Sequence, residues 1–290
     1  MSYTSISSML AAARLSGRPL YAVIRDDDCR ENGCTRESSH RQIGQLWDAM
    51  RQSSAQYRAD DRSNSGFIGG DAAKLRAAAD SGALLGGAYF LRVTEEALKV
   101  AECNACMKRI VAAPTAGSCG VLPAVLIPLA EERAPDTEVI LQALYIAAGF
   151  GQVAAARASV SGAQGGCQAE IGVASAMAAA ALTHIMGGTD EQCAHAFAIA
   201  LGNLLGLVCD PVAGLVEIPC VKRNVIGAVN AVSAADMALA GITAHIPADE
   251  VIDAMGEVGD AMPTSLRETG QGGLAATPTG RRMAESLPRG

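Results

Sequence analysis

The chain has 290 residues, of which 50% are hydrophobic and 18% are charged, and its formal net charge is −7. This length and apolar content allow one large globular domain or two modest ones. Lys and Arg are scattered and form no basic stripe with interleaved aromatic residues, so nucleic acid is not an expected partner.

The first residues show no signal for secretion. The segment "MSYTSISSMLAAARLSGRPLYAVIRDDD" has no basic stretch followed by an apolar run with a small-residue cleavage site. The longer apolar runs, "VASAMAAAALTHIMGG" and "FAIALGNLLGLV", are short for a membrane span or contain His184 or Asn203, and Ala and Gly dominate them. We therefore expect a cytoplasmic protein that does not bind a membrane.

Apolar residues recur at three- and four-residue spacing along most of the chain, which predicts helices. Little of the chain alternates with a period of two, and β-branched residues are too sparse for a sheet. Asp71 follows two glycines and is expected to cap the fourth helix. In chain order, helices are expected over residues 5–15, 19–30, 37–58, 72–80, 92–109, 121–131, 138–155, 167–186, 190–205, 221–240 and 248–258.

The expected fold class is all-α, a compact multi-helix domain. Alanine is frequent and aromatic residues make up only 3%, so helix axes can approach closely. Residues 1–60 are more charged and less rich in glycine, and we expect them to form an N-terminal helical layer packed on the same domain. Residues 61–290 then form the main domain.

Five loops rich in Gly or Pro interrupt the helical pattern. Most of them lead into a helix N-terminus, where free N–H groups and the positive end of the dipole favour an anion. Five such loops in an otherwise helical chain indicate a shared site; the alternative is that they are only tight helix connections. The loops are "SNSGFIGGD", "APTAGSCG", "SGAQGGC", "CDPVAGLVEIPC" and "RETGQGGLAATPTG".

Three of the nine cysteines, Cys167, Cys209 and Cys220, lie within or beside these loops. Pro and Gly stiffen the segment between the last two, so it can bring both thiols to one place. Three thiolates can hold three irons of a 4Fe-4S cluster and leave the fourth iron open to a substrate. The spacing matches no short cluster signature, and buried structural cysteines are the alternative.

The other cysteines carry weaker signals. Cys103 and Cys106 form a CxxC inside a predicted helix, with no second pair to complete a zinc site, so packing is the expected role. Cys29 and Cys34 lie in a charged segment and are expected to be incidental. Cys119 stands at a helix start, where it either approaches the site or is structural. The four histidines form no HExxH-type pair that would indicate a zinc hydrolase.

Five ordered motifs together resemble the iron-sulfur-dependent L-serine dehydratases, in particular their α subunit or α-like catalytic domain. The resemblance runs from about Ser65 to Gly280 and is weak over the first sixty residues. The family usually has other residues where Cys103 and Cys106 stand. The motifs are "SGFIGGDAAKL", "NACMKRIVAAPTAGSCGVLPAVL", "SGAQGGCQAEIGVASAMAAAAL", "CDPVAGLVEIPCVKRN" and "RETGQGGLAATPTG".

The resemblance implies a lyase that removes water from L-serine and gives pyruvate and ammonia, as part of amino-acid degradation that can feed gluconeogenesis. It makes Cys167, Cys209 and Cys220 the ligands of a 4Fe-4S cluster and residues 61–290 the mainly helical catalytic domain. A separate β subunit, a homo-oligomer or both are expected, because no β portion is obvious in this chain.

For the reaction itself, we expect the open iron to bind the substrate hydroxyl as a Lewis acid. The carboxylate of L-serine is expected at the helix starts of "TAGSCG" and "SGFIGGD". The acceptor of the α-proton is not assigned, since no histidine lies in a matching motif and a partner subunit could supply it. The expected substrate-binding residues, which could instead cap turns or be surface charges, are Ser65, Lys74, Thr115, Ser118 and Arg267.

Three other functions stay open at this point. A pyridoxal-phosphate dehydratase would need a Schiff-base lysine, and Lys74 beside "GGD" is the most suitable of the four lysines. A cluster-dependent L-cysteine desulfidase would keep the metal site and change the leaving group. A non-catalytic helical subunit would use the cysteines only for packing.

Overall fold

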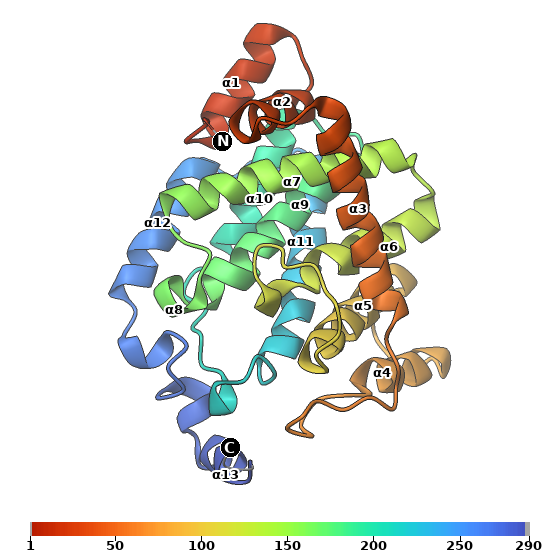
Figure 1. Ribbon diagram of the computed structural model, residues 1–290, viewed down its shortest axis with the longest axis vertical. Helices are drawn as coiled ribbons and strands as arrows, with labels where there is room; N and C mark the ends of the chain where they lie inside the picture. The colour runs from red at the N-terminus through yellow and green to blue at the C-terminus, as the bar shows by residue number, and fades with distance from the viewer. Residues whose placement is uncertain (1, 288–290) are drawn as a thin grey trace.

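The computed structural model describes residues 2–287. Within this range the chain forms thirteen α-helices and no β-strand, which confirms the all-α prediction. Helices α1 and α2 lie at one end of the molecule and α13 lies at the other (Figure 1). The helices are α1 Ile6–Ser16, α2 Leu20–Asn32, α3 Arg36–Ala55, α4 Asp71–Asp80, α5 Ala88–Ala105, α6 Val121–Arg133, α7 Thr137–Arg157, α8 Gly162–Gly165, α9 Val173–Ile185, α10 Asp190–Gly202, α11 Cys220–Leu239, α12 Ala248–Ala261 and α13 Pro278–Glu285.

Side-chain caps set the starts of several of these helices. Ser5 and Thr35 each accept a hydrogen bond from a backbone N–H in the first turn of the following helix. Thr189 and Gln192 form a reciprocal capping box at the start of α10. Gly17 and Gly33 end α1 and α2 in the left-handed conformation, which costs glycine little. Local sequence therefore fixes these helix limits.

The predicted helix over 92–109 is displaced. In the structure α5 begins at Ala88, after Gly87, and it ends before Met107, whose φ of 59° is incompatible with continuing the helix. The predicted cap of α4 is also wrong, because Gly70 occupies the N-cap position and Asp71 is the first helical residue.

Two helices were absent from the sequence prediction, and one predicted helix is divided. The short helix α8 lies inside a glycine-rich loop, and α13 starts at Pro278 with Thr277 as its N-cap. The Pro, Thr and Gly of that segment are also typical of a loop, so the sequence pattern was ambiguous. The predicted helix over 167–186 is a π-helical turn, Gln168–Gly172, followed by α9.

Helix α9 is the centre of the core and packs on α7, α10 and α11 (Figure 1). All of its residues from Val173 to Thr183 are buried, and many are alanine. A Cβ added to Gly227 of α11 would lie 3.0 Å from side-chain atoms of Ile171 and Val121. The Ser175 hydroxyl also donates to the Gly227 carbonyl at 2.7 Å. Small residues therefore permit the close helix approach that the composition predicted.

Helix α7 is long and apolar enough to cross a membrane, judged by length and composition alone. In the structure, 67% of its most apolar 18-residue window is buried. The helix contacts α9 on one side and α2 and α3 on another. Its apolar side chains thus serve the core of this fold.

The N-terminal helices pack on the rest of the described chain. Helix α2 contacts α7, and α3 contacts both α5 and α7. At the α2–α7 contact, Gly149 faces the buried side chain of Ile24, and a Cβ at this glycine would lie 2.8 Å from an Ile24 methyl carbon. The domain boundary near residue 60 stays a prediction.

Gly149→Ala tests this packing. The added methyl group would overlap Ile24, so we expect the free energy of unfolding to fall by about 1–3 kcal/mol despite the higher helix propensity of alanine. Gly44→Ala in α3 is the matched control, because nothing lies within 4 Å of its added Cβ, and it should gain about 0.4–1 kcal/mol. Urea unfolding of both variants measures the difference, and equal changes of the same sign would contradict the described α2–α7 contact.

Candidate active site and metal centre

Three segments that are distant in the sequence meet beside the N-terminus of α11 (Figure 1). Cys167 follows Gly166, whose φ of 74° turns the chain into the π-helical segment. Cys209 is held by an isolated parallel bridge to Arg267: its N–H donates to the Leu266 carbonyl at 2.8 Å, and its carbonyl accepts from the N–H of Glu268 at 2.8 Å. These backbone contacts join two of the five predicted loops, the one that starts at Cys209 and the one that starts at Arg267.

Two thiols and one carboxylate form a potential metal-binding group. The ligand atoms of Cys167, Glu170 and Cys209 all lie within 4.8 Å of one another. The two cysteines are buried and the glutamate is partly buried. Thr115 Oγ1 donates to Glu170 Oε1 at 2.7 Å and so fixes the orientation of the carboxylate. Thiolates are preferred ligands of iron-sulfur clusters and of zinc, so this donor set suits such a metal centre.

Gly162 leaves the space that this group needs. A Cβ at this position would lie 2.5 Å from Glu170 Oε2 and 3.0 Å from Cys209 Sγ. A side chain could therefore be accommodated only by displacing a ligand atom. The glycine-rich sequence before Cys167 is explained by this close approach of backbone to the donor group.

Arg223 supplies positive charge to the site from the first turn of α11. Its Nη1 lies 3.4 Å from Cys167 Sγ and donates to the Val208 carbonyl at 2.7 Å. Its Nη2 forms an ion pair with Asp210 Oδ1 at 2.8 Å, although that oxygen accepts no well-aligned hydrogen bond. The other oxygen of Asp210 accepts from the Leu274 N–H at 2.7 Å. The guanidinium thus contacts Val208 and Asp210, the residues immediately before and after Cys209.

The two neighbouring thiols differ in acidity. A hydrogen bond from Cys209 lowers the pKa of the Cys167 thiol against the effect of burial, and the positive charge of Arg223 lowers it further. The same hydrogen bond, together with burial, raises the pKa of Cys209. Burial raises the pKa of Glu170, and its hydrogen bond from Thr115 opposes this shift. Of these two thiols, Cys167 therefore ionises more easily.

Cys220 is buried at the first position of α11, three residues before Arg223. Its sulfur does not belong to the compact Cys167–Glu170–Cys209 group. Burial raises the pKa of Cys220 to about 12, and the negative charges of Cys167 and Glu170 contribute to the shift. The structure therefore brings two of the three predicted ligands together, and the third lies outside their group. Cluster ligation by all three stays a prediction.

Among the predicted substrate-binding residues, Thr115 contacts the candidate site directly through Glu170. Ser118 is fully buried, and its hydroxyl makes long contacts to Thr115 that close the short 3-10 turn Ala116–Ser118. Ser65 donates to Glu217, which lies between Cys209 and Cys220 in the sequence. These hydroxyl groups therefore reach the loops of the site but already have protein partners.

The two predicted cations differ in their surroundings. The Lys74 side chain is 75% exposed, pairs with Asp71 at 2.7 Å and has no contact with the thiol group. Arg267 is only partly exposed. It follows Leu266, whose backbone carbonyl accepts a hydrogen bond from the N–H of Cys209. Across residues 2–287, its guanidinium forms no ion pair or side-chain hydrogen bond. Arg267 is thus the better placed of the two for binding a carboxylate.

One of the two expected anion sites is occupied by the protein. At the start of α4, the N–H groups of Gly70 and Ala72 donate to the carboxylate of Glu102 at 2.7 and 3.0 Å. These donors are the ones that the "SGFIGGD" loop was expected to offer to a substrate. The anion that balances this helix N-terminus is therefore Glu102, an internal residue.

The four lysines lack the features of a Schiff-base residue. In the described chain each one has a carboxylate neighbour: Asp71 for Lys74 and Lys222, Glu96 for Lys99, and Asp61 for Lys108. A lysine that forms an imine needs a lowered pKa, which a neighbouring carboxylate opposes.

Sequence reasoning did not identify Glu170, Asp210, Arg223 or Asn224 as site residues. All four lie inside the motifs that carried the family resemblance. Glu170 is three residues after Cys167, and Arg223 is three residues after Cys220, a spacing that places side chains on one side of a helix. This spacing is the sequence signal that could have identified Glu170 and Arg223.

The family model described as serine dehydratase alpha chain matches residues 8–275. The chain belongs to this family. The match also covers most of the first sixty residues, where the motif resemblance was weak.

Curated relatives include a probable L-serine dehydratase alpha chain of Bacillus subtilis (strain 168), which is 58% identical over 78% of this chain and 75% of the relative. The L-serine dehydratase alpha chain of Peptoniphilus asaccharolyticus is 42% identical over 92% of each chain. An L-serine dehydratase of Escherichia coli (strain K12) is 49% identical over 62% of this chain, which corresponds to 40% of that longer protein.

Asn224 joins two walls of the site and gives a test of its packing. Its side chain is 1% exposed, accepts from the Gly120 N–H at 2.8 Å and donates to the carbonyls of Gly117 and Cys220 at 2.8 and 2.9 Å. We expect Asn224→Ala to cost about 1–3 kcal/mol of stability for each buried group left without a partner.

Asn203→Ala is the matched control, since this exposed asparagine bonds only to Asn230 through its side chain. Its effect should stay within about 0.5 kcal/mol. Guanidinium unfolding measures both variants, and a similar small change in the two would show that Asn224 does not support the site.

Proposed function

We propose that this chain is the catalytic alpha chain of an L-serine dehydratase, which removes water from L-serine and gives pyruvate and ammonia. The observation that carries the proposal is the buried group of Cys167, Glu170 and Cys209 beside Arg223, in a member of the serine dehydratase alpha chain family. Loss of the β-hydroxyl and the α-proton leaves an enamine, and its imine tautomer is hydrolysed to the two products.

The proposed cofactor is a 4Fe-4S cluster held by Cys167, Cys209 and Cys220. A bound cluster of this kind would supply a Lewis acid, an iron with an open coordination position for the leaving hydroxyl. Glu170 supplies an oxygen donor beside two of the thiols. Support for the third cysteine is its burial at the start of α11 and its electrostatic coupling to Cys167 and Glu170.

The protein's own part in this chemistry begins with charge. Several thiolates and a carboxylate in a buried site repel one another, and Arg223 is the cation that reduces this repulsion. The Val208 carbonyl and Asp210 hold the guanidinium in place. Thr115 holds Glu170 through one carboxylate oxygen and leaves the other directed at Cys167, 4.0 Å away.

Arg267 is proposed to bind the carboxylate of L-serine. It is the predicted cation on the loop bridged to Cys209, and its guanidinium forms no ion pair across the described chain. The hydroxyl groups of Thr115, Ser118 and Ser65 are proposed to assist, although each has a protein partner in the structure. Lys74 would have to leave Asp71 to take part. The α-proton acceptor is not assigned to a residue of this chain.

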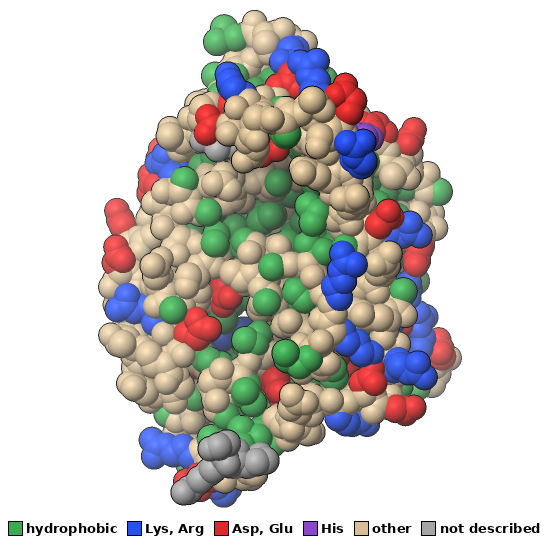
Figure 2. Space-filling model, viewed as in Figure 1, with side chains coloured by type: hydrophobic (Ala, Val, Ile, Leu, Met, Phe, Trp, Pro, Cys, Tyr) green, Lys and Arg blue, Asp and Glu red, His purple; other side chains and the backbone are tan. Residues whose placement is uncertain are grey.

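A separate β subunit is the proposed partner, supported by the alpha-chain names of the relatives and of the family model. Assembly into a homo-oligomer, a cytoplasmic location and a role in amino-acid degradation belong to the same proposal. On the face shown in Figure 2, basic and acidic side chains are interspersed. That pattern suits a protein or small-molecule partner better than a nucleic acid.

Iron and sulfide analysis of the anaerobically reconstituted chain tests the cofactor. We expect about four irons and four sulfides per chain, since that is the content of one 4Fe-4S cluster. Cys167→Ala, Cys209→Ala and Cys220→Ala should each lower the iron content and abolish pyruvate formation from L-serine. Cys34→Ala, which changes a partly exposed cysteine at the far end of α2, is the control and should retain both.

Two results would overturn this proposal. One is a full iron content that survives all three cysteine substitutions. The other is an absorbance band typical of pyridoxal phosphate in a protein without iron. If the cluster is present but L-cysteine yields pyruvate much faster than L-serine does, the leaving group is a thiol and the substrate assignment is wrong.

A further inference from the structure

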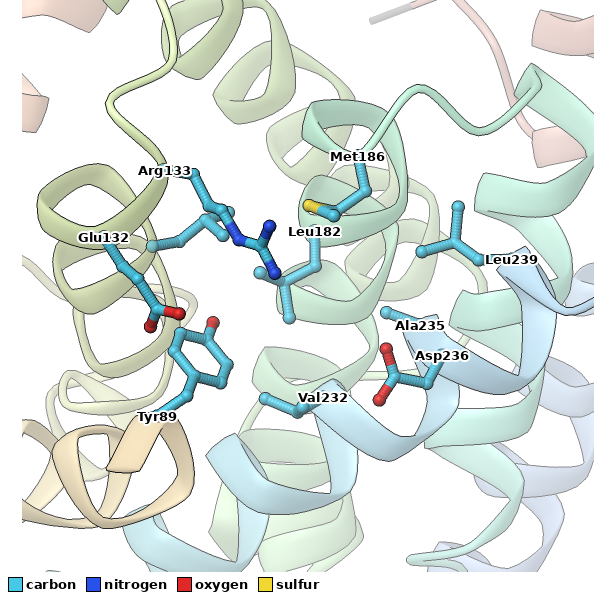
Figure 3. Close-up of a pocket in the computed structure, with 10 residues that line it drawn as sticks. Tyr89, Glu132, Arg133, Leu182, Met186, Val232, Ala235, Asp236 and Leu239 are labelled. Carbon is cyan, nitrogen blue, oxygen red and sulfur yellow. The ribbon is translucent and has the colours of Figure 1, made fainter. Parts of the chain in front are cut away.

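A pocket lies between α5, α6, α9 and the C-terminal half of α11 (Figure 3). Its volume is about 220 Å³. Asp236, one of its residues, is sixteen positions after Cys220 along α11, which is about 24 Å at 1.5 Å per residue. The pocket is therefore separate from the thiol group, and nothing in the proposed dehydration uses it.

Three charged side chains surround the opening of this pocket. Arg133 and Glu132 come from the last turn of α6, and Asp236 comes from α11 on the other side. In Figure 3 the Arg133 guanidinium extends over Leu182 toward the pocket, and the Asp236 carboxylate faces the same space. Across residues 2–287 none of the three forms an ion pair or a side-chain hydrogen bond.

The inner surface is apolar and held in place. Leu129 and Leu182 are buried, and Val232 and Leu239 complete an aliphatic floor. Tyr89 forms one wall, and its hydroxyl donates to the Val125 carbonyl at 3.2 Å. This hydrogen bond anchors the ring to α6. The pocket thus combines a fixed apolar interior with charges of both signs at its rim.

We propose that this pocket binds a free α-amino acid with an aliphatic side chain of the size of valine or leucine. Arg133 of α6 binds the carboxylate, Asp236 of α11 binds the ammonium group, and the side chain enters the aliphatic floor. An α-amino acid carries its ammonium and carboxylate groups on the same carbon. Such a pair matches the unpaired Arg133 and Asp236 on opposite sides of one small opening. The volume is below the range for drug-sized ligands and suits a small metabolite.

Isothermal titration calorimetry of the full chain with L-leucine tests this site. We expect saturable binding of one L-leucine per chain. Arg133→Gln and Asp236→Asn should each weaken it about tenfold or more, since each removes a charge-assisted hydrogen bond. 4-Methylpentanoate, which lacks the ammonium group, and 3-methylbutylamine, which lacks the carboxylate, should bind about tenfold more weakly to the unchanged protein.

Arg41→Gln and Glu257→Gln are matched controls, because both residues are exposed charges on helices outside the pocket, and binding should be unchanged in them. Circular dichroism confirms that each variant is folded. Three results would overturn the proposal: no binding of L-leucine at millimolar concentration, binding of either analogue as tight as that of L-leucine, or unchanged affinity for L-leucine in both Arg133→Gln and Asp236→Asn. None of these outcomes depends on whether the cluster or the dehydratase activity is present.

Discussion

The contact between Arg223 and Cys167 is the interaction on which the candidate site depends. Burial works against the charge on Arg223, but the negative charges of Cys167 and Asp210 hold its pKa above the ordinary value. The hydrogen bond from Cys209 is the main cause that lowers the pKa of Cys167, and the positive charge of Arg223 lowers it further against the effect of burial. The guanidinium also ties the start of α11 to the Cys209 loop through Val208 and Asp210. One side chain thus contributes both positive charge and a structural link to the donor group.

Small residues make this arrangement possible. Gly162 leaves space next to Glu170 and Cys209. Gly117 lets a second backbone segment pass the same carboxylate, because a Cβ added at this position would lie 3.2 Å from Glu170 Oε1. Farther into the core, the alanines of α9 and Gly227 of α11 let the helices that carry the cysteine loops approach one another. Close packing of the core and close packing around the donor atoms have the same origin, the scarcity of large side chains.

The fold class could be predicted because the apolar spacing repeats over long segments and helix caps are local. The irregular elements could not. The π-helical turn after Cys167 has no distinct sequence pattern, and the role of Glu102 at the start of α4 depends on a contact thirty residues away. Cys167 and Cys209 were singled out from their loops, but Glu170 and Arg223 were recognised only once the loops were seen to meet. Side chains whose role depends on a partner far along the chain are not visible in local patterns.

The most direct test of the central claim is Mössbauer spectroscopy of the anaerobically reconstituted chain loaded with ⁵⁷Fe, recorded with and without L-serine. If three cysteines hold the cluster and leave one iron open, a signal of about one quarter of the total iron should shift when L-serine is added, while the rest stays unchanged. A spectrum in which L-serine alters no iron, or in which all irons are equivalent and fully ligated by protein, would contradict the account.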